Sequence, residues 1–287
     1  MTSKQKNLIT RSITGILYVA IMVTSFLQSV NMIVVFALIT GLATWEFTGL
    51  VNEYKHVNVN RLITTVAGVY FFLAVAGVNS GAIQTNAVFV PYLLTIIYLF
   101  ISGLYTKSSD SVNDWAYTML SQMYIALPLS TINVIAFRQA ADGLNYYYYL
   151  LPLSTFIFLW ANDTGAYCTG SLFGKHKLFP RISPAKSWEG SIGGGILVLI
   201  VASIMYYIES QGENLSGLNL IEWLGLGFVV VVFGTWGDLV ESLLKRTLGI
   251  KDSGNILPGH GGILDRFDSS LMAIPASVVY LYTLTLL

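Results

Sequence analysis

Charge and cysteine are scarce in this chain, and each shortage excludes a class of protein. Of its 287 residues only 10% are charged, whereas 54% are hydrophobic and the mean hydropathy is +0.66. These values lie outside the range of ordinary soluble domains and indicate an integral membrane protein. The single cysteine, Cys168, excludes an intramolecular disulfide and a zinc site built from several thiolates. A formal net charge of zero argues against nonspecific binding to nucleic acid, so we expect no nucleic-acid partner.

The apolar runs are not interrupted by any low-complexity linker, soluble domain or clear internal repeat. A bilayer core about 30 Å thick needs roughly 20 apolar residues per helix, and this length predicts about nine membrane-spanning helices. We therefore expect an all-α polytopic protein with a single membrane domain, residues 1–287. Within it, residues 1–138 carry no recognised motif and residues 148–287 carry the polar motifs. The expected spans cover residues 13–26, 32–50, 62–78, 87–105, 115–137, 148–170, 190–208, 221–244 and 267–286.

The Lys and Arg residues are unevenly distributed between alternate loops. If the N-terminus is cytoplasmic, fourteen of the fifteen lie on the cytoplasmic side and Arg138 alone lies outside. Because cytoplasmic loops retain Lys and Arg, this bias predicts a cytoplasmic N-terminus and, with an odd number of spans, an external C-terminus. The same orientation places the acidic connection with Glu209, Glu213 and Glu222 outside and the tyrosines at 146–149 in an aromatic belt. No small-residue cleavage site follows the first run, so we expect a retained anchor.

One segment, residues 237–269, holds a large share of the charges between two apolar runs. If the eighth span continues as a helix through Arg246, four polar residues at i, i+3, i+4 and i+7 share one of its faces. They are Asp238, Glu241, Ser242 and Lys245. A carboxylate near the membrane costs several kcal/mol unless it is paired, hydrated or metal-bound, so this face should line a polar cavity. An ordinary pattern of interfacial ion pairs is the alternative.

The loop after this helix is rich in glycine and surrounded by cations. Its glycines are Gly249, Gly254, Gly259, Gly261 and Gly262. Glycine lets backbone amides approach a phosphate closely, although an ordinary glycine-rich turn is the alternative because a Walker lysine-serine pair is lacking. The surrounding cations are at a density suited to a polyphosphate. They are Lys245, Arg246, Lys251 and Arg266.

Two acids, Asp265 and Asp268, stand at the start of the last span with i, i+3 spacing. One interpretation is a helix N-cap followed by an acid in the first turn. A hard divalent cation such as Mg²⁺, however, prefers carboxylate oxygens together with phosphate oxygens, and Asp238 with Asp265 could supply the carboxylates from two neighbouring helices. The carboxylates, glycines and cations at a lipid boundary together predict phosphoryl or nucleotidyl transfer to a lipid phosphate.

Four stretches carry a resemblance to a known family. The run S-L-L-K-R-T-L-G-I-K-D-S-G-N-I-L-P-G-H-G-G-I-L-D-R-F-D at 242–268 resembles the signature of the phosphatidate cytidylyltransferases, also called CDP-diacylglycerol synthases. The resemblance extends to N-D-T-G-A-Y at 162–167, G-K-H-K-L at 174–178 and I-S-P-A-K-S-W-E-G at 182–190. The family usually has a second lysine where this chain has Ala185, and often a threonine where it has Ser187. The first departure suggests that Lys186 carries the necessary charge. The second keeps a hydroxyl group at position 187.

The resemblance implies an enzyme that transfers CMP from CTP to phosphatidate, giving CDP-diacylglycerol and pyrophosphate. It implies in-line attack of the lipid phosphate on the α-phosphorus and a divalent cation, Mg²⁺ or another, held by Asp238 and Asp265. The implied catalytic residues are Asp238, Asp265, Lys245, Arg246, Lys251 and Asp268. The implied substrate-binding residues are Asp163, Lys175, Lys177, Ser183, Lys186, Ser187, Glu189, His260, Gly261, Gly262 and Arg266.

The partners that follow from the resemblance are CTP, phosphatidate and the lipid bilayer, and a homodimer is compatible with it. We expect a multi-pass protein of the cell inner (cytoplasmic) membrane with its active site facing the cytoplasm. One alternative is a related nucleotidyl or phosphoryl transferase acting on another lipid phosphate. Another is a polytopic transporter of phosphate-bearing molecules, which the lack of visible repeats disfavours. Asp163 could instead lock neighbouring helices by hydrogen bonding, and the sequence suggests no partner for Glu46.

Overall fold

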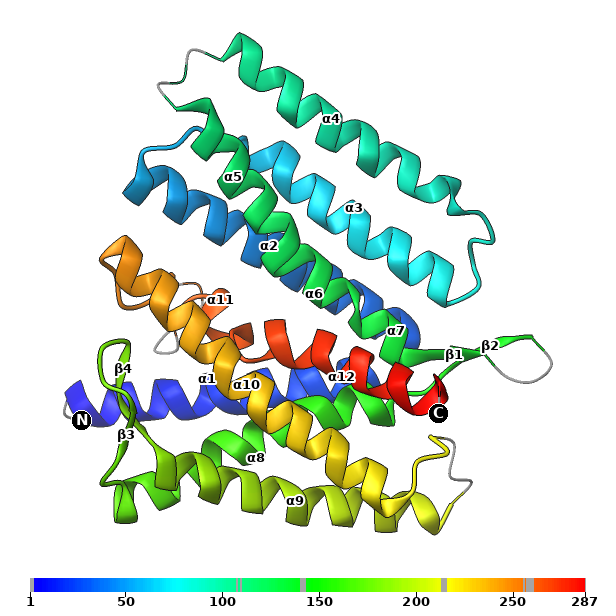
Figure 1. Ribbon diagram of the computed structural model, residues 1–287, viewed down its shortest axis with the longest axis vertical. Coiled ribbons are helices and arrows are strands. Elements are labelled where there is room, and N and C mark those ends of the chain that lie inside the picture. The colour runs from blue at the N-terminus through cyan, green and yellow to red at the C-terminus, as the bar shows by residue number, and fades with distance from the viewer. Residues whose placement is uncertain are drawn as a thin grey trace. The chain divides into compact units, whose positions relative to one another are not determined.

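The computed structural model describes residues 3–106, 108, 110–139, 143–212, 216–254, 256 and 261–286. Helices account for almost all of the regular structure in these residues, and the strands among them form two short hairpins (Figure 1). The prediction of an all-α polytopic membrane protein is confirmed, because seven of the described helical segments are long and apolar enough to cross a membrane. Helices suit this environment because their backbone hydrogen bonds form within the segment.

Seven helical segments within the described residues are long and apolar enough to cross a membrane. They are Ser29–Lys55, Arg61–Asn79, Asn86–Tyr105, Ser111–Ala136, Trp188–Ser210, Leu220–Leu248 and Leu264–Leu284, and a shorter apolar helix covers Ser12–Phe26. The helix α8 (Leu150–Phe173), expected as a span, has 24 residues but is not among the seven. Its apolar run is interrupted by polar residues that include Asn162 and Asp163. The total of nine spans and the sides of the two termini stay predictions.

One face of α9 (Trp188–Ser210) shows how the protein meets lipid. Ile192, Ile196, Ile200 and Ile204 are each more than half exposed. Residues four apart lie on the same face of a helix, so these four form a continuous apolar stripe. Such a stripe would be unfavourable in water and is typical of a helix surrounded by acyl chains.

The described chain divides into two compact units, Met1–Tyr147 with Thr247–Phe267 and Tyr148–Arg246 with Asp268–Leu287. The single membrane domain expected from the sequence stays a prediction. The regular elements of the first unit are α1 (Ser3–Phe26), α2 (Ser29–Lys55), α3 (Arg61–Asn79), η1 (Asn86–Phe89), α4 (Val90–Tyr105), α5 (Ser111–Ser121), η2 (Gln122–Ala126), α6 (Leu127–Ser130), α7 (Ile132–Ala136), β1 (Phe137–Gln139), β2 (Asn145–Tyr147) and α11 (Leu264–Phe267).

An aromatic core in the first unit joins the two ends of the sequence. The ring centroids of Phe26 and Phe36 are 5.4 Å apart, and those of Phe36 and Phe267 are 6.2 Å apart. All three side chains are buried. Aromatic pairs at these separations add to the free energy gained from burial. The short helix α11 is therefore anchored on α2, and this contact places the glycine-rich loop next to α2.

The tyrosine run at 146–149 lies partly in the interior. In the first unit the Tyr147 hydroxyl donates to the carbonyl oxygen of Phe26 at 2.8 Å, where β2 pairs antiparallel with β1. In the second unit Tyr148 is buried, whereas Tyr149 is exposed. The predicted aromatic belt stays a prediction, and within this run Tyr148 faces the interior of its unit.

The second unit contains the helices α8, α9, α10 (Leu220–Leu248, up to Arg246) and α12 (Ser270–Leu286), with the strands β3 (Lys177–Phe179) and β4 (Ser183–Ser187). Its two helices α8 and α9 pack backbone to backbone. A Cβ atom on Gly194 would lie 2.7 Å from the carbonyl oxygen of Asn162, and one on Gly165 would lie 2.9 Å from the Cα of Gly194. Small residues permit this approach between membrane helices, and the approach fixes the polar residues of α8 beside α9.

The hairpin formed by β3 and β4 leads into α9. Lys177 pairs with Ser187 and Phe179 pairs with Ser183 in an antiparallel register. The Ser187 hydroxyl caps α9 by accepting from the Gly190 amide at 3.1 Å. This cap satisfies one of the amides that a helix N-terminus leaves without an intrahelical partner, and it holds the adjacent Lys186 at the start of α9.

Candidate active site

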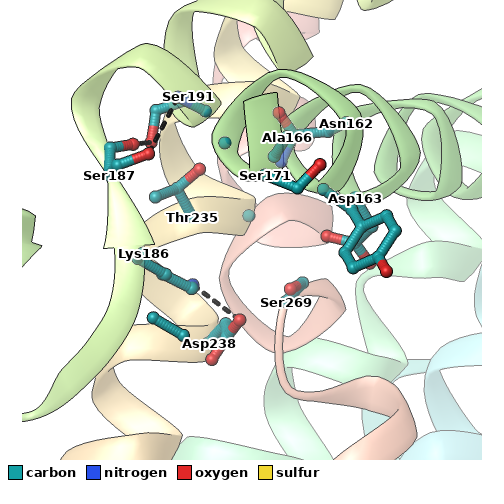
Figure 2. Close-up of a pocket in the computed structure, with 15 residues that line it drawn as sticks. Asn162, Asp163, Ala166, Ser171, Lys186, Ser187, Ser191, Thr235, Asp238 and Ser269 are labelled. Atoms are coloured by element: carbon teal, nitrogen blue, oxygen red, sulfur yellow. Dashed lines mark hydrogen bonds and ion pairs between the residues drawn. The ribbon is translucent and has the colours of Figure 1, made fainter. Parts of the chain in front are cut away.

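A polar pocket of about 350 Å³ lies within the second unit, between α8, α9, α10 and the β4 strand (Figure 2). It brings together the predicted residues Asp163, Lys186, Ser187 and Asp238, which come from three separate parts of the sequence. The remaining lining residues are Asn162, Ala166, Tyr167, Gly170, Ser171, Ala185, Gly190, Ser191, Gly234, Thr235 and Ser269. Hydroxyl, amide, ammonium and carboxylate groups therefore line one cavity in an otherwise apolar protein.

An ion pair stands at one wall of the pocket. The Lys186 ammonium lies 2.6 Å from Oδ2 of Asp238, and the two side chains are 24% and 29% exposed. The other carboxylate oxygen of Asp238 accepts from the Ser242 hydroxyl at 3.1 Å. A lysine here is a compact positive charge with donors left over for a further anion. The geometry agrees with the phosphate-binding role predicted for Lys186, and that role stays a prediction.

Adjacent residues of α8 contribute a carboxylate and an amide. Asp163 lines the pocket, and Asn162 beside it is buried with 6% exposure (Figure 2). Among the residues that the structure describes, the side-chain oxygen of Asn162 has no hydrogen-bond partner. A buried acceptor without a partner is costly, and this oxygen packs against Gly194 of α9, where a Cβ atom would lie 2.5 Å from it.

The polar face predicted for the eighth span is present, because α10 continues as a helix to Leu248. Lys245 lies 2.5 Å from Glu241, one turn away, and Glu241 is fully buried. The alternative interpretation of this face, an ion-pair pattern, thus applies to these two residues. Asp238 is the member of the face that lines the pocket.

Asp268 is the third aspartate of this unit, after Asp163 and Asp238. It lies within electrostatic range of Asp163, Asp238 and Lys245, and its Oδ1 accepts from the Ser269 amide at 2.6 Å. A search of the described residues finds no group of three or more His, Cys, Asp or Glu side chains that could hold a metal ion. A metal in this pocket would therefore need oxygen ligands from a substrate as well.

The hairpin residues predicted to bind substrate have different surroundings. Glu189 accepts from the backbone amides of Lys175 and His176 at 3.2 Å, and lies 2.5 Å from the His176 ring. Lys175 and Lys177 are exposed, and neither they nor Ser183 line the pocket. Glu189 therefore closes the loop before α9, and direct substrate contact by these four residues stays a prediction.

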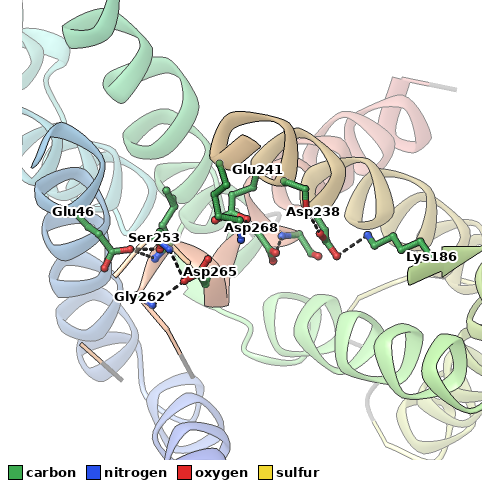
Figure 3. Close-up of polar contacts among 12 residues, drawn as sticks. Glu46, Lys186, Asp238, Glu241, Ser253, Gly262, Asp265 and Asp268 are labelled. Carbon is green, nitrogen blue, oxygen red and sulfur yellow. Dashed lines mark hydrogen bonds and ion pairs between the residues drawn. The ribbon is translucent and has the colours of Figure 1, made fainter. Parts of the chain in front are cut away.

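The glycine-rich loop belongs to the first unit. Oδ2 of Asp265 accepts from the amides of Ser253 and Gly262 at 2.9 and 2.8 Å (Figure 3). Lys251 and Arg266 are exposed, and His260 lies outside the described residues. Asp265 and Asp238 fall in different units, so the predicted metal pair stays a prediction. The contacts of Arg246, Gly261 and Gly262 with phosphate are predictions as well.

Sequence reasoning missed Glu46 of α2. Its carboxylate accepts from the Ser253 hydroxyl and from the amides of Ile263 and Leu264 at 3.0 and 3.1 Å (Figure 3). The available signal was a carboxylate in the middle of an apolar span, which requires an internal partner. The partners are more than 200 residues away in the sequence, so no local pattern identifies them.

Comparison with known proteins identifies the family of the chain. A model of the cytidylyltransferase family matches residues 9–284. Proteins named phosphatidate cytidylyltransferase from Staphylococcus aureus (strain COL) and Staphylococcus haemolyticus are each 35% identical over 266 residues, which is 92% of this chain and 95% of theirs. One from Staphylococcus epidermidis is 34% identical over the same shares. The chain therefore belongs to the cytidylyltransferase family.

Proposed function

We propose that this enzyme transfers CMP from CTP to phosphatidate at the membrane surface. An oxygen of the lipid phosphate attacks the α-phosphorus of CTP, the bond from that phosphorus to the bridging oxygen breaks, and pyrophosphate leaves with the electron pair. The products are CDP-diacylglycerol and pyrophosphate. The names of the similar proteins support this choice of substrates, and so does the cavity described next.

The observation that carries the proposal is an apolar cavity beside the polar pocket in the second unit. Ser191 and Thr235 line both. The cavity has a volume of about 530 Å³ and is otherwise lined almost wholly by apolar side chains, namely Leu178, Phe179, Trp188, Ile192, Ile196, Leu199, Phe228, Val231, Val232, Trp236 and Leu239, with Gly195. An amphipathic substrate could place its phosphate in the polar pocket and an acyl chain in the apolar cavity.

Within the pocket, Lys186 is the side chain whose chemistry suits binding of phosphate. Lys186 would neutralise charge on the reacting phosphates, and the effect of such a charge is largest where water is excluded. Because a phosphate dianion already carries a lone pair for attack, the site must mainly orient the two reactants.

The donor chemistry of the pocket fits a hard divalent cation. Asp163 and Asp238 present carboxylate oxygens on its walls, and Mg²⁺ usually takes one or two carboxylates plus substrate phosphate oxygens. We propose that Asp238 supplies a carboxylate to Mg²⁺ or a similar ion, with Asp163 and Asp268 in support. Such an ion would supply neutralisation of the triphosphate charge.

The distribution of Lys and Arg supports a location in the inner (cytoplasmic) membrane with the site facing the cytoplasm. A triphosphate such as CTP does not cross a bilayer unaided, so the site must face the compartment that contains the nucleotide. We propose this orientation for the enzyme as a multi-pass protein.

The test is an assay of the purified full-length protein in mixed micelles with CTP, phosphatidate and Mg²⁺. We expect pyrophosphate release and an equal amount of CDP-diacylglycerol, measured by mass spectrometry. ATP, GTP and UTP in place of CTP should give much slower release. Parallel reactions with lysophosphatidate and with a polyprenyl phosphate test which lipid phosphate is the substrate. Folded protein that turns over another lipid phosphate, or none, would refute the proposal.

A further inference from the structure

Glu46 is a buried acid in the part of the chain that carries no motif. It lies in α2 with 8% of its surface exposed. Burying a carboxylate is costly unless donors surround it. Three donors do so here, the Ser253 hydroxyl and the amides of Ile263 and Leu264, and they belong to the glycine-rich loop and the first residue of α11. The Glu46 carboxylate therefore connects two segments of the chain, one at Ser253 and the other at residues 263–264.

The loop makes room for Glu46 by carrying glycine on both sides of the carboxylate. A Cβ atom on Gly262 would overlap Oε1 of Glu46, and one on Gly254 would lie 2.7 Å from Oε2. Any side chain at either position would displace the carboxylate or the loop. These glycines therefore have a structural task that is separate from the phosphate contact predicted for Gly262.

Asp265 holds the same two segments from a second direction. Its Oδ2 accepts from the amides of Ser253 and Gly262. Ser253 is thus fixed twice, through its amide by Asp265 and through its hydroxyl by Glu46. Hydrogen bonds to charged acceptors are stronger than those between neutral groups, so the two carboxylates together hold Ser253 and residues 262–264 in place.

We propose that Glu46 is a positioning residue for CMP transfer, because it fixes the loop that presents Asp265 and Arg266. The catalytic part of this inference rests on the proposed function, whereas the structural part does not. Glu46 touches the loop and acts on the reaction through it. A displacement of catalytic groups by about 1 Å can cost roughly a hundredfold in rate, so loss of this anchor should lower turnover strongly.

The structural part is tested by amide hydrogen exchange in the full-length protein, read by mass spectrometry on a peptide covering residues 261–267. Glu46→Gln keeps the size of the side chain, but its NH₂ group cannot accept a hydrogen bond. At least one of the amides of Ile263 and Leu264 then loses its acceptor. We expect exchange in this peptide to be about tenfold faster or more, since one net hydrogen bond corresponds to roughly that factor.

The matched control is Thr48→Val on the same helix. Thr48 is also fully buried, and its hydroxyl bonds to carbonyl oxygens within α2, namely those of Thr44 at 2.8 Å and Trp45 at 3.2 Å. This variant should leave exchange at 261–267 and turnover unchanged. Ser253→Ala removes one of the three donors and should give an intermediate increase in exchange. If Glu46→Gln does not fold, Ser253→Ala carries the test.

The catalytic part is tested by steady-state kinetics on folded variants. We expect Glu46→Gln to lower kcat about 10- to 100-fold while KM for phosphatidate stays within about threefold, because the lipid cavity is untouched. Faster exchange with unchanged kcat would overturn the positioning role, and unchanged exchange would overturn the anchor itself. A wild-type protein without turnover would refute the proposed function instead, and the exchange result would still decide whether Glu46 holds the loop.

Discussion

Replacing Lys186 with glutamine removes the positive charge of the polar pocket while keeping most of the side-chain length. Lys186 lies 2.6 Å from Asp238, and Ser187 next to it caps α9. The backbone of the hairpin and the cap do not depend on the ammonium group. The variant therefore separates the charge of residue 186 from the local fold.

The structure lets the effects on stability and on rate be estimated separately. Both side chains of the Lys186–Asp238 pair are about a quarter exposed, and a pair of this kind contributes about 1 kcal/mol or less to stability. Loss of a positioned charge or donor at a reacting oxygen typically costs 10²- to 10³-fold in kcat, or about 3–4 kcal/mol. We expect Lys186→Gln to lose activity by this larger factor and stability only by the smaller one.

The assay measures the initial rate of pyrophosphate release at saturating CTP and phosphatidate, together with the thermal unfolding midpoint in the same detergent. Arg181→Gln is the matched control, because Arg181 is an exposed cation in the turn of the same hairpin and does not line the pocket. Lys186→Arg keeps the cation and should retain more activity than Lys186→Gln. The reasoning is refuted if folded Lys186→Gln keeps more than about a tenth of the wild-type rate, or if Arg181→Gln loses as much.

Three further outcomes are expected. Lys245→Met removes the cation beside the fully buried Glu241 and should lower the free energy of unfolding by about 3–5 kcal/mol, measured by denaturant titration; an unchanged midpoint would mean that Lys245 does not stabilise that carboxylate. Gly194→Ala should destabilise the protein by about 1–3 kcal/mol because its Cβ would lie 2.7 Å from a carbonyl oxygen of α8, whereas Gly195→Ala, with its nearest contact at 3.7 Å, should be neutral; equal melting temperatures would contradict the close helix packing. His176→Cys, made in a Cys168→Ser background, should react with an impermeant maleimide from the cytoplasmic side, and labelling from the other side alone would overturn the proposed orientation.

Hydropathy predicted most helices well because the bilayer requires long apolar segments. The expected spans 190–208 and 221–244 correspond to α9 and α10 within a few residues. The expected span 115–137 is instead built from α5, η2, α6 and α7, with a π-helical turn immediately before Leu127 and Pro128. A hydropathy window averages over such a turn and cannot detect it.

The composition of the pocket was predictable only through motifs, since its residues are far apart in sequence. Asp163, Lys186 and Asp238 each belong to, or lie next to, a stretch that resembles the family, and the fold brings them to one cavity. The position of Ser269 in the pocket became evident from the fold, and the unpaired oxygen of Asn162 from the packing of α8 against α9. Periodicity within one helix shows which residues share a face of that helix. It does not show which other helix that face packs against.

Glu209 shows how a charge assigned to a loop can belong to the interior. The sequence placed it in an acidic connection outside the membrane, yet it lies in the last turn of α9 and is 7% exposed. Its carboxylate accepts from the Trp223 indole at 3.0 Å, and also from the Tyr148 hydroxyl and from Ser216. Two of these partners lie 14 and 61 residues away, beyond the reach of local patterns.

The surroundings of the acids separate structural carboxylates from candidate reactive ones better than sequence position does. Glu46 and Glu209 are surrounded by donors from the chain itself, and Glu241 is fully buried beside Lys245. Water and substrate cannot replace such partners without leaving buried groups unpaired, which costs several kcal/mol. Asp163 and Asp238, by contrast, line a cavity that is also lined by Lys186 and several hydroxyl groups. Carboxylates of this second kind can exchange partners during a reaction, so the chemistry should depend on them, whereas the buried glutamates should stabilise the segments that they hold together.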